Sequence, residues 1–390
     1  MKTEKVKGFN DFTGEEALKR TEIKKILVET FEKYGFEPAE TPMIEYEEFV
    51  RGQNQNDEAV SDIFKLKDKG KRKLALRYEF TFQLKRIAKN KKIPYKRYQI
   101  GEVFRDEPVQ SNRVRQFTQC DVDIVGSTIK DEAEILALAN EIFEKLGIKI
   151  IIYFNNRKLL NEILDELKIR NKEKVLREID KLDKLSEKQV KKNLKKDKTE
   201  KILQIIKKPE NYFKKYKSYS DIEELKNLCK IYNVKLIFLP SLARGLSYYN
   251  RSVFEVRVKD TKESICAGGS YRLYEGNQKK EPKIKGISAI QSTGISFGLE
   301  RLSLVAKLKT EKEKFLIISL NQDKKAINLV QKMRKQGKNT VLFYGKPSKA
   351  LEYANSYKIN KVIFVGKEEI KKKKFKIKDM KTGKETYEKL

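Results

Sequence analysis

Three arginines and one aromatic residue surround a turn in the segment Tyr98–Gly126 and have the chemistry needed to hold a nucleotide. The segment predicts two strands joined by a polar loop, because β-branched and aromatic residues flank a stretch containing Pro, Ser and Asn. Arg113, Arg115 and Phe117 alternate with other residues, so in a strand their side chains share one face. A guanidinium group suits a phosphate, and a flat ring suits a base. The hairpin, with Arg105 before its turn, predicts a nucleotide site; a solvated hairpin of a very basic protein is the alternative.

A second segment favours the nucleotide interpretation. Ser292–Leu304 predicts a strand that reaches Gly298 and then turns into a helix carrying Arg301. It resembles motif 3 of the class II aminoacyl-tRNA synthetases, and the hairpin resembles their motif 2. Between the two, Ser241–Val256 (SLARGLSYYNRSVFEV) resembles the signature peptide of the histidyl-tRNA synthetase family, RGLDYY followed by VFE. Three further segments match that family in order and spacing: Lys7–Ala17, Leu76–Thr81 and Ala267–Tyr271, the last where the family has AGGRYD.

The resemblance implies an α+β fold in two domains. A class II catalytic domain on an antiparallel sheet is expected over residues 1–310, with a helical insertion at about 157–232. A small α/β anticodon-binding domain is expected over residues 314–390. The residue patterns agree, since 157–232 has Leu and Ile at helical spacing and no glycine, and the chain after Glu313 alternates between strand and helix periods. Gly35–Tyr46 resembles motif 1, which builds the dimer interface of class II enzymes, so a homodimer is implied.

The resemblance also assigns ATP and Mg²⁺ to the motif residues. Arg105 would hold the α-phosphate and Arg301 the γ-phosphate of a bent ATP. Phe117 would stack on adenine, Arg113 would assist the phosphates, and Glu107 would contact the adenine side or a metal. No metal ligand set among the protein side chains follows from the sequence.

Recognition of L-histidine is assigned to a second group of residues. By resemblance, Glu79 and Thr81 lie on one strand face and hold the α-amino group together with Gln119. Asp123 and Tyr249 would hold the imidazole between them, with Tyr248 nearby, and Arg244 would reach the substrate carboxylate and the α-phosphate. A hairpin carboxylate paired with a neighbouring Arg or Lys is the other interpretation of Asp123. Because QCDVDIVG carries an acid at this position, it resembles the archaeal and eukaryotic branch of the family.

Composition fits a partner such as histidine tRNA. The chain has 390 residues, and its 88 Lys and Arg against 56 Asp and Glu give a net charge of +32. Such a surface favours a polyanion. Three cysteines without metal-ligand spacing fit a reducing cytoplasm, and no apolar run is long enough to span a membrane. The absence of histidine excludes His-based catalysis and His metal sites, but amino-acid activation requires no protein base, since the substrate carboxylate is the nucleophile.

The predicted function is therefore that of a histidine–tRNA ligase, and three alternatives stay open. A regulatory paralogue, such as the partner of ATP phosphoribosyltransferase, would keep the histidine pocket but lack the anticodon-binding domain. A synthetase of the same subclass with another specificity, and a non-catalytic RNA-binding protein, are further alternatives. The chain departs from the family pattern at four positions, Thr118, Ser247, Ser270 and Arg272.

Overall fold

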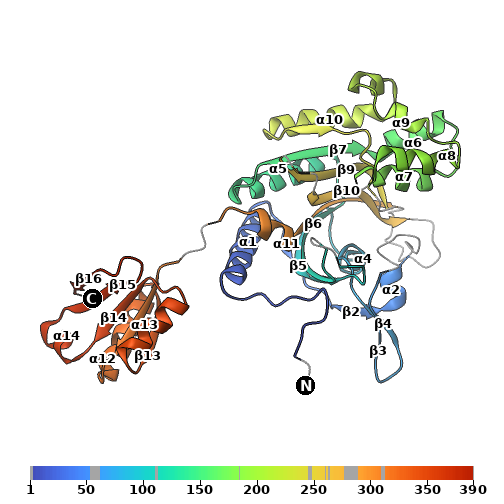
Figure 1. Ribbon diagram of the computed structural model, residues 1–390. Helices are drawn as coiled ribbons and strands as arrows, with labels where there is room; N and C mark the ends of the chain where they lie inside the picture. The colour runs from blue at the N-terminus through green and yellow to red at the C-terminus, as the bar shows by residue number, and fades with distance from the viewer. Residues whose placement is uncertain are drawn as a thin grey trace. The chain divides into compact units, whose positions relative to one another are not determined.

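A computed structural model describes residues 3–52, 62–109, 113–183, 185–244, 248–259, 261, 264–275, 289–308 and 312–389. Ser247 and Glu311, the first residue after the expected catalytic domain, lie outside these residues. The chain divides into two compact units, Met1–Leu308 and Lys309–Leu390 (Figure 1).

The first unit is built on an eight-stranded sheet. Neighbouring strands are antiparallel, except that the two edge pairs, β1 with β5 and β7 with β8, are parallel. The predicted hairpin is its β5–β6 pair, and the predicted antiparallel sheet is confirmed. In spatial order the strands are β1 (Glu37–Pro38), β5 (Tyr95–Phe104), β6 (Gln116–Val125), β11 (Ala289–Gly298), β10 (Ser264–Glu275), β9 (Tyr249–Val258), β7 (Ile150–Asn156) and β8 (Leu236–Phe238).

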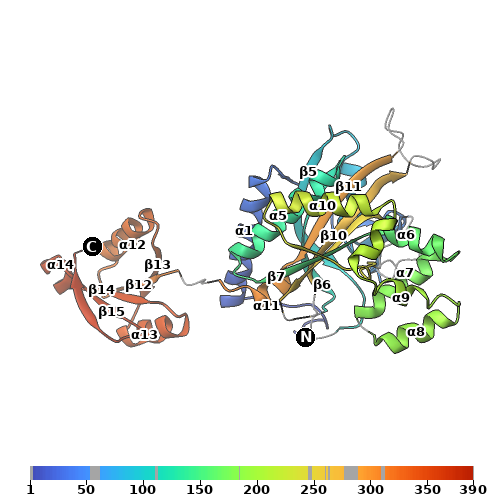
Figure 2. The ribbon, with the colours of Figure 1, turned by 90° about the horizontal axis from the view of Figure 1, so that it is seen from above.

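The two faces of this sheet differ because side chains alternate along each strand. On β6, Cys120, Val122 and Ile124 are fully buried in the apolar core. That face is covered by α1 (Gly14–Lys33) and α5 (Ile129–Lys145), and α10 (Tyr219–Ile231) packs on α5 (Figure 2). The opposite face carries the polar residues of β6, and it is the face on which the candidate site lies.

The residues between β7 and β8 form a group of helices, as their spacing predicts. Three of the helices begin at a residue suited to that end: Asn156 and Asn171 accept backbone N–H groups, and Ser186 forms a capping box with Gln189. Their apolar sides join the main core, and the short helices gather beside β7 and β9 in Figure 1. The helices are α6 (Arg157–Glu166), α7 (Lys172–Asp180), α8 (Glu187–Lys195), α9 (Ile202–Ile205) and α10, with 3₁₀ turns at Lys181–Asp183 and Glu210–Lys215.

Three strands from the N-terminal part of the sequence form a second, smaller sheet. Its order is β2 (Ile44–Tyr46), β4 (Lys73–Leu76) and β3 (Lys65–Lys67). Two short helices accompany it, α2 (Glu47–Arg51) and α4 (Thr81–Ile87), and α11 (Leu299–Val305) follows β11. No helix of the described ranges is long and apolar enough to cross a membrane.

The second unit is a five-stranded sheet in the order β13-β12-β14-β15-β16. β13 (Asn339–Tyr344), β12 (Lys314–Ser319) and β14 (Lys361–Val365) are parallel, while β15 (Phe375–Asp379) and β16 (Glu385–Glu388) are antiparallel. Apolar clusters lie on both faces of the sheet, packed under α12 (Asp323–Lys335) and α13 (Pro347–Ser356). The alternating pattern predicted these elements; it missed α14 (Lys367–Lys372), which has little apolar periodicity.

Candidate active site

The polar face of the large sheet has a floor of small residues around Asp123. On β6, Gln119, Asp121 and Asp123 point to this face, and their partners on β11 are Gly298, Ser296 and Gly294. A Cβ atom at Gly294 would lie 2.1 Å from Asp123 Oδ1, so only glycine leaves room for this carboxylate. This part of the sheet is therefore polar and lined by small residues on β11, and its carboxylates are buried.

Asp123, predicted to bind the imidazole, is held by two side chains of the neighbouring strands. Arg97 Nη2 on β5 lies 2.8 Å from Asp123 Oδ2, and Arg97 is fully buried. The Tyr271 hydroxyl on β10 donates to Asp123 Oδ1 at 2.5 Å. Burial raises the pKa of Asp123, while Arg97 and the Tyr271 hydrogen bond oppose that shift. Asp123 thus has the paired-carboxylate contacts of the alternative interpretation, and both partners also orient it on the polar face.

Three tyrosines gather beside this carboxylate. The Tyr248 ring centroid lies 4.8 Å from that of Tyr249 and 5.5 Å from that of Tyr271. Gly269 makes this packing possible, since a Cβ there would come within 2.7 Å of the Tyr249 ring. Burial raises the pKa of Tyr249 to about 12, so its hydroxyl is a neutral donor and acceptor. The structure brings the predicted Asp123, Tyr248 and Tyr249 together and adds Tyr271, which sequence reasoning did not select.

The predicted strand face for Glu79 and Thr81 is wrong. β4 ends at Leu76, and Thr81 is the first residue of α4. Arg77 explains the break, because its buried guanidinium donates to the backbone oxygens of Glu102 and Thr41 and so anchors the chain between strand and helix. Glu79 nevertheless lies by the tyrosine cluster, where its charge helps to raise the pKa of Tyr248 and of Tyr249 after burial, the larger cause.

The hairpin arginines contact residues next to the turn. Arg113 Nη1 lies 2.9 Å from Glu107 Oε2, and Arg115 Nε donates to the Glu107 backbone oxygen at 3.2 Å. The Arg105 guanidinium lies 5.1 Å from the Phe117 ring centroid, and its Nε donates to the Tyr78 backbone oxygen at 3.3 Å. Cations and an aromatic face therefore meet at one end of the hairpin, as the predicted nucleotide site requires.

Arg244, of the predicted signature peptide, has an unusual backbone and a buried partner. Its φ is 53°, in the left-handed region that costs a non-glycine residue about 1–3 kcal/mol and that recurs at functional sites. Arg244 Nη1 lies 3.1 Å from Glu255 Oε2, and Glu255 also pairs with Arg257 at 2.5 Å. Arg301 lies in the first turn of α11, shortly after the last glycine of β11, and donates to the Ser264 backbone oxygen.

A network that sequence reasoning missed connects β6 with α11. Glu300 accepts from the Thr118 backbone N–H at 3.1 Å and pairs with Arg20 of α1 at 2.9 Å. Thr118 Oγ1 in turn accepts from Arg20 at 2.9 Å and donates to Glu102 at 2.6 Å. Because Glu300 precedes Arg301, these contacts fix the start of the helix that carries Arg301. The four residues come from α1, β5, β6 and α11, which are distant in the sequence, so no local sequence signal marks them as partners.

Comparison with known proteins identifies this arrangement. A family model described as histidyl-tRNA synthetase matches residues 8–302, which is more than half of the chain. The chain belongs to the histidyl-tRNA synthetase family. A second family model, described as an anticodon binding domain, matches residues 314–389.

Individual proteins similar to this chain carry names of the same family. The chain is 34% identical over 423 residues to histidine–tRNA ligase 1 of Bacillus cereus, covering 99% of this chain and 97% of that protein. Its fold is similar to the crystal structure of the histidyl-tRNA synthetase of Nostoc, with a TM-score of 0.84 at 24% identity over 100% of this chain and 97% of that one. A Bacillus halodurans structure titled ATP phosphoribosyltransferase regulatory subunit/histidyl-tRNA synthetase gives 0.75 at 18% identity, over 93% of this chain and 98% of that one.

These comparisons confirm the predicted fold class, the synthetase family and the enzyme class, and they do not favour the regulatory paralogue. These three relatives are all bacterial, so they lend no support to the expected archaeal and eukaryotic branch.

Two departures from the synthetase pattern have structural explanations. Ser270 points to the helix-covered face, away from the candidate site, and its hydroxyl donates to Glu132 of α5 at 2.5 Å. Glu132 is fully buried and also pairs with Arg251 of β9 at 2.6 Å. Thr118 takes part in the network with Glu300. Arg272 is exposed.

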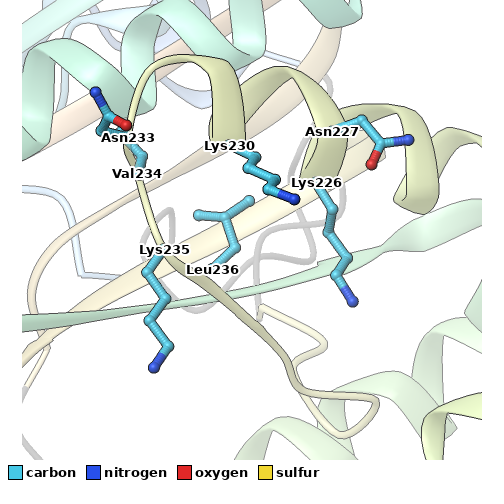
Figure 3. A pocket seen from close by; sticks show the side chains of 7 residues that line it. All are labelled: Lys226, Asn227, Lys230, Asn233, Val234, Lys235 and Leu236. Atoms are coloured by element: carbon cyan, nitrogen blue, oxygen red, sulfur yellow. The ribbon is translucent and has the colours of Figure 1, made fainter.

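A surface hollow lies on the helical part of the first unit and contains none of the candidate site residues. It has a volume of about 410 Å³ and lies between the end of α10 and the start of β8. Figure 3 shows Lys226, Lys230 and Lys235 around it with two asparagines, a valine and a leucine. Of its lining residues, Lys226 is paired with Glu210 at 2.7 Å.

Proposed function

We propose that this chain is a histidine–tRNA ligase that activates L-histidine with ATP, releases pyrophosphate, and transfers histidine to the 3′ end of histidine tRNA. The observation that carries the proposal is the polar face of the large sheet. It holds the Asp123 and tyrosine cluster on the same surface as the aromatic and cationic end of the β5–β6 hairpin. A histidine side chain and an adenine nucleotide would therefore lie on one continuous surface, as joining them requires.

Activation needs positioning and charge neutralisation. The histidine carboxylate attacks the α-phosphorus of ATP, the bond to the pyrophosphate oxygen breaks, and pyrophosphate leaves with its charge. Arg105 and Arg244 would hold the α-phosphate, and Arg301 the γ-phosphate. Cations of this kind lower the barrier because they are already in place where negative charge develops on the phosphates in the transition state. Phe117 would stack on adenine, with Arg113 and Glu107 at the turn.

Histidine would be recognised through both polar ends of the substrate. Glu79, Thr81 and Gln119 would hold the α-ammonium group, and Arg244 the carboxylate. Asp123 and Tyr249 would accept from and donate to the imidazole, with Tyr248 beside it. A site with buried polar groups discriminates strongly, because an apolar isostere leaves those groups without partners.

Mg²⁺ would enter with ATP. Among the described residues no group of three acidic or cysteine side chains could hold a metal. Mg²⁺ is usually bound by one or two carboxylates together with substrate phosphates. Glu107 is one of two adjacent carboxylates at the turn of the hairpin, with Asp106, and an ion held there would neutralise triphosphate charge.

Several finer features belong to the same proposal. The second unit would read the anticodon of histidine tRNA, and the net charge of +32 would favour tRNA association. A homodimer is supported by the exposed apolar residues of the motif 1-like segment, since Met43, Ile44 and Tyr46 are 49%, 49% and 58% exposed. We also propose that the chain is located in the cytoplasm and that its domains span residues 1–310 and 314–390. From the segment QCDVDIVG alone, we propose that it belongs to the archaeal and eukaryotic branch of the family.

The deciding experiment is ATP–pyrophosphate exchange with each amino acid in turn. We expect exchange with histidine alone, followed by charging of purified histidine tRNA. Exchange with another amino acid would refute the roles of Asp123 and Tyr249. Binding of histidine without any exchange would instead support the regulatory alternative.

The role of the second unit can be tested by deleting the residues after Glu313. Adenylate formation should persist in the truncated chain, while charging of histidine tRNA should weaken. Unchanged charging would contradict an anticodon-reading role.

A further inference from the structure

A second carboxylate, Asp121, is buried in the polar face of the sheet next to Gln119. Gln119 Nε2 donates to Asp121 Oδ2 at 2.9 Å. The two residues are 7% and 4% exposed, and Asp121 lies opposite Gln99 of β5 and Ser296 of β11. The proposed catalytic roles make no use of Asp121, although it lies between two residues of the proposed histidine site.

This hydrogen bond determines which end of the Gln119 amide is available to a ligand. An ionised carboxylate only accepts hydrogen bonds, so it holds the NH₂ end of the amide and turns the oxygen away. Gln119 Oε1 is buried and has no hydrogen-bond partner among the residues that the structure describes. A buried oxygen without a partner suits an ammonium group, which has three donors.

We infer that Asp121 is a positioning residue for the substrate's α-ammonium group, which it serves by holding Gln119 with Oε1 toward that group. The inference rests on the proposed function, because it deepens the assignment of Gln119 to the amino group. If the amide were reversed, its NH₂ end would face the ammonium group and repel it. An ionised Asp121 therefore holds Gln119 in the orientation that attracts the substrate, whereas a neutral Asp121 leaves both orientations of the amide open.

The surroundings of Asp121 make this charge sensitive to pH near neutrality. Burial raises the pKa of Asp121 to about 7; Arg97 of β5 opposes the shift, Asp123 of β6 adds to it, and hydrogen bonds from Ser296 and Gln119 oppose it. Cys266 of β10 remains a neutral thiol, because burial raises its pKa well above the ordinary value. Below about pH 7 a protonated Asp121 can donate as well as accept, so it no longer fixes the amide. The KM for histidine should then rise as the pH falls through this range, while kcat changes little.

The test compares the full-length wild-type chain with Asp121→Asn by ATP–pyrophosphate exchange. An asparagine has the same shape but cannot ionise, so it mimics the protonated carboxyl at every pH. At about pH 8 we expect a roughly tenfold rise in the histidine KM, and a KM for ATP and a kcat that stay within about twofold. Asp165→Asn, the same change at an exposed position of α6, is the matched control and should leave all three constants unchanged.

The pH profile separates positioning from a general structural role. The ratio of the mutant KM to the wild-type KM should be large above about pH 7 and approach one below it. The imidazole of the substrate titrates equally in both proteins and cancels in this ratio. If Asp121→Asn does not fold, the wild-type profile decides, once the histidine KM has been corrected for the titration of the substrate imidazole.

Three results would overturn the inference. They are a wild-type histidine KM in Asp121→Asn at about pH 8, a mutant-to-wild-type ratio that does not vary with pH, and a wild-type histidine KM that is constant across neutrality. Absence of histidine-dependent exchange in the wild-type protein would instead overturn the proposed function itself, and this inference with it.

Discussion

The family pattern AGGRYD has an arginine at the position of Ser270 in β10. We expect Arg251 of the neighbouring strand β9 to supply the positive charge of that arginine. Glu132 of α5 is fully buried, and its contacts are Arg251 Nε at 2.6 Å and Ser270 Oγ at 2.5 Å. Ser270 is neutral, so Arg251 supplies the positive charge that Glu132 requires. An arginine at position 270 would reach the same carboxylate from β10.

The cost of removing this charge can be worked out from the burial. Truncating one partner of a buried ion pair costs about 3–5 kcal/mol, because the remaining charge keeps its desolvation penalty. Arg251 is 17% exposed and Glu132 lies in the first turn of α5, where the helix dipole stabilises a carboxylate by about 0.3–1 kcal/mol. Both facts place the effect at the lower end of the range. We expect Arg251→Ser to lower the free energy of unfolding by about 3 kcal/mol.

Urea unfolding of the full-length chain, followed by circular dichroism, measures this effect. The exchanged double variant, Arg251→Ser with Ser270→Arg, should recover most of the loss, because it returns a positive charge to Glu132 from β10. Arg272→Ser, which removes an exposed arginine of that strand, is the control and should cost less than about 0.5 kcal/mol. A loss below about 1 kcal/mol in Arg251→Ser, or a double variant no more stable than the single one, would refute the reasoning.

Four further outcomes are expected. Arg244→Ala should abolish adenylate formation while circular dichroism shows an intact fold, and normal turnover would contradict its assignment to the α-phosphate. Arg105→Ala should raise the KM for ATP and slow activation in the exchange assay, with the histidine KM little changed. Gly294→Ala should weaken histidine binding measured by calorimetry, since the added Cβ would lie 2.1 Å from Asp123 Oδ1. Burial raises the pKa of Glu141, but hydrogen bonds from Lys33, Lys145 and Tyr34 outweigh it and lower the pKa from 4.5 to about 2. The stabilisation that ionised Glu141 provides is present above about pH 4.5 and should be lost as the pH falls toward 2. Glu141→Gln should therefore flatten the acid-unfolding curve in this range.

Much of the fold could be predicted from periodicity, because each strand and helix repeats its own pattern. Alternation predicted a shared strand face for Arg113, Arg115 and Phe117, but β6 begins at Gln116, so of these three only Phe117 lies in the strand. The strand face that the resemblance implied for Glu79 and Thr81 is absent, because β4 ends at Leu76 and α4 begins at Thr81. Two residues are too few to show whether a segment continues as a strand or turns into a helix.

Contacts between distant segments could not be predicted, since they depend on register. Arg97 lies opposite Asp123 only because the β5–β6 hairpin pairs in one particular register. Glu132 and Arg251 are separated by 119 residues, and nothing local to either residue indicates the pairing. The candidate site residues could therefore be selected from the sequence, while the residues that contact and orient them could not.

The arginines assigned to ATP have protein partners of their own, and this shapes how the site can select its substrate. Arg113 pairs with Glu107 at 2.9 Å, and Arg244 pairs with Glu255 at 3.1 Å. An incoming phosphate would compete with these carboxylates, so its binding is an exchange of one anionic partner for another, and the net gain is smaller than a phosphate–guanidinium contact suggests. Glu255 keeps Arg257 at 2.5 Å when Arg244 leaves, which lowers the cost of that exchange. Any nucleoside triphosphate would meet the same cost at these positions. On the proposed assignment, discrimination among nucleotides would come from contacts with the base at Phe117, and discrimination among amino acids from the cluster around Asp123.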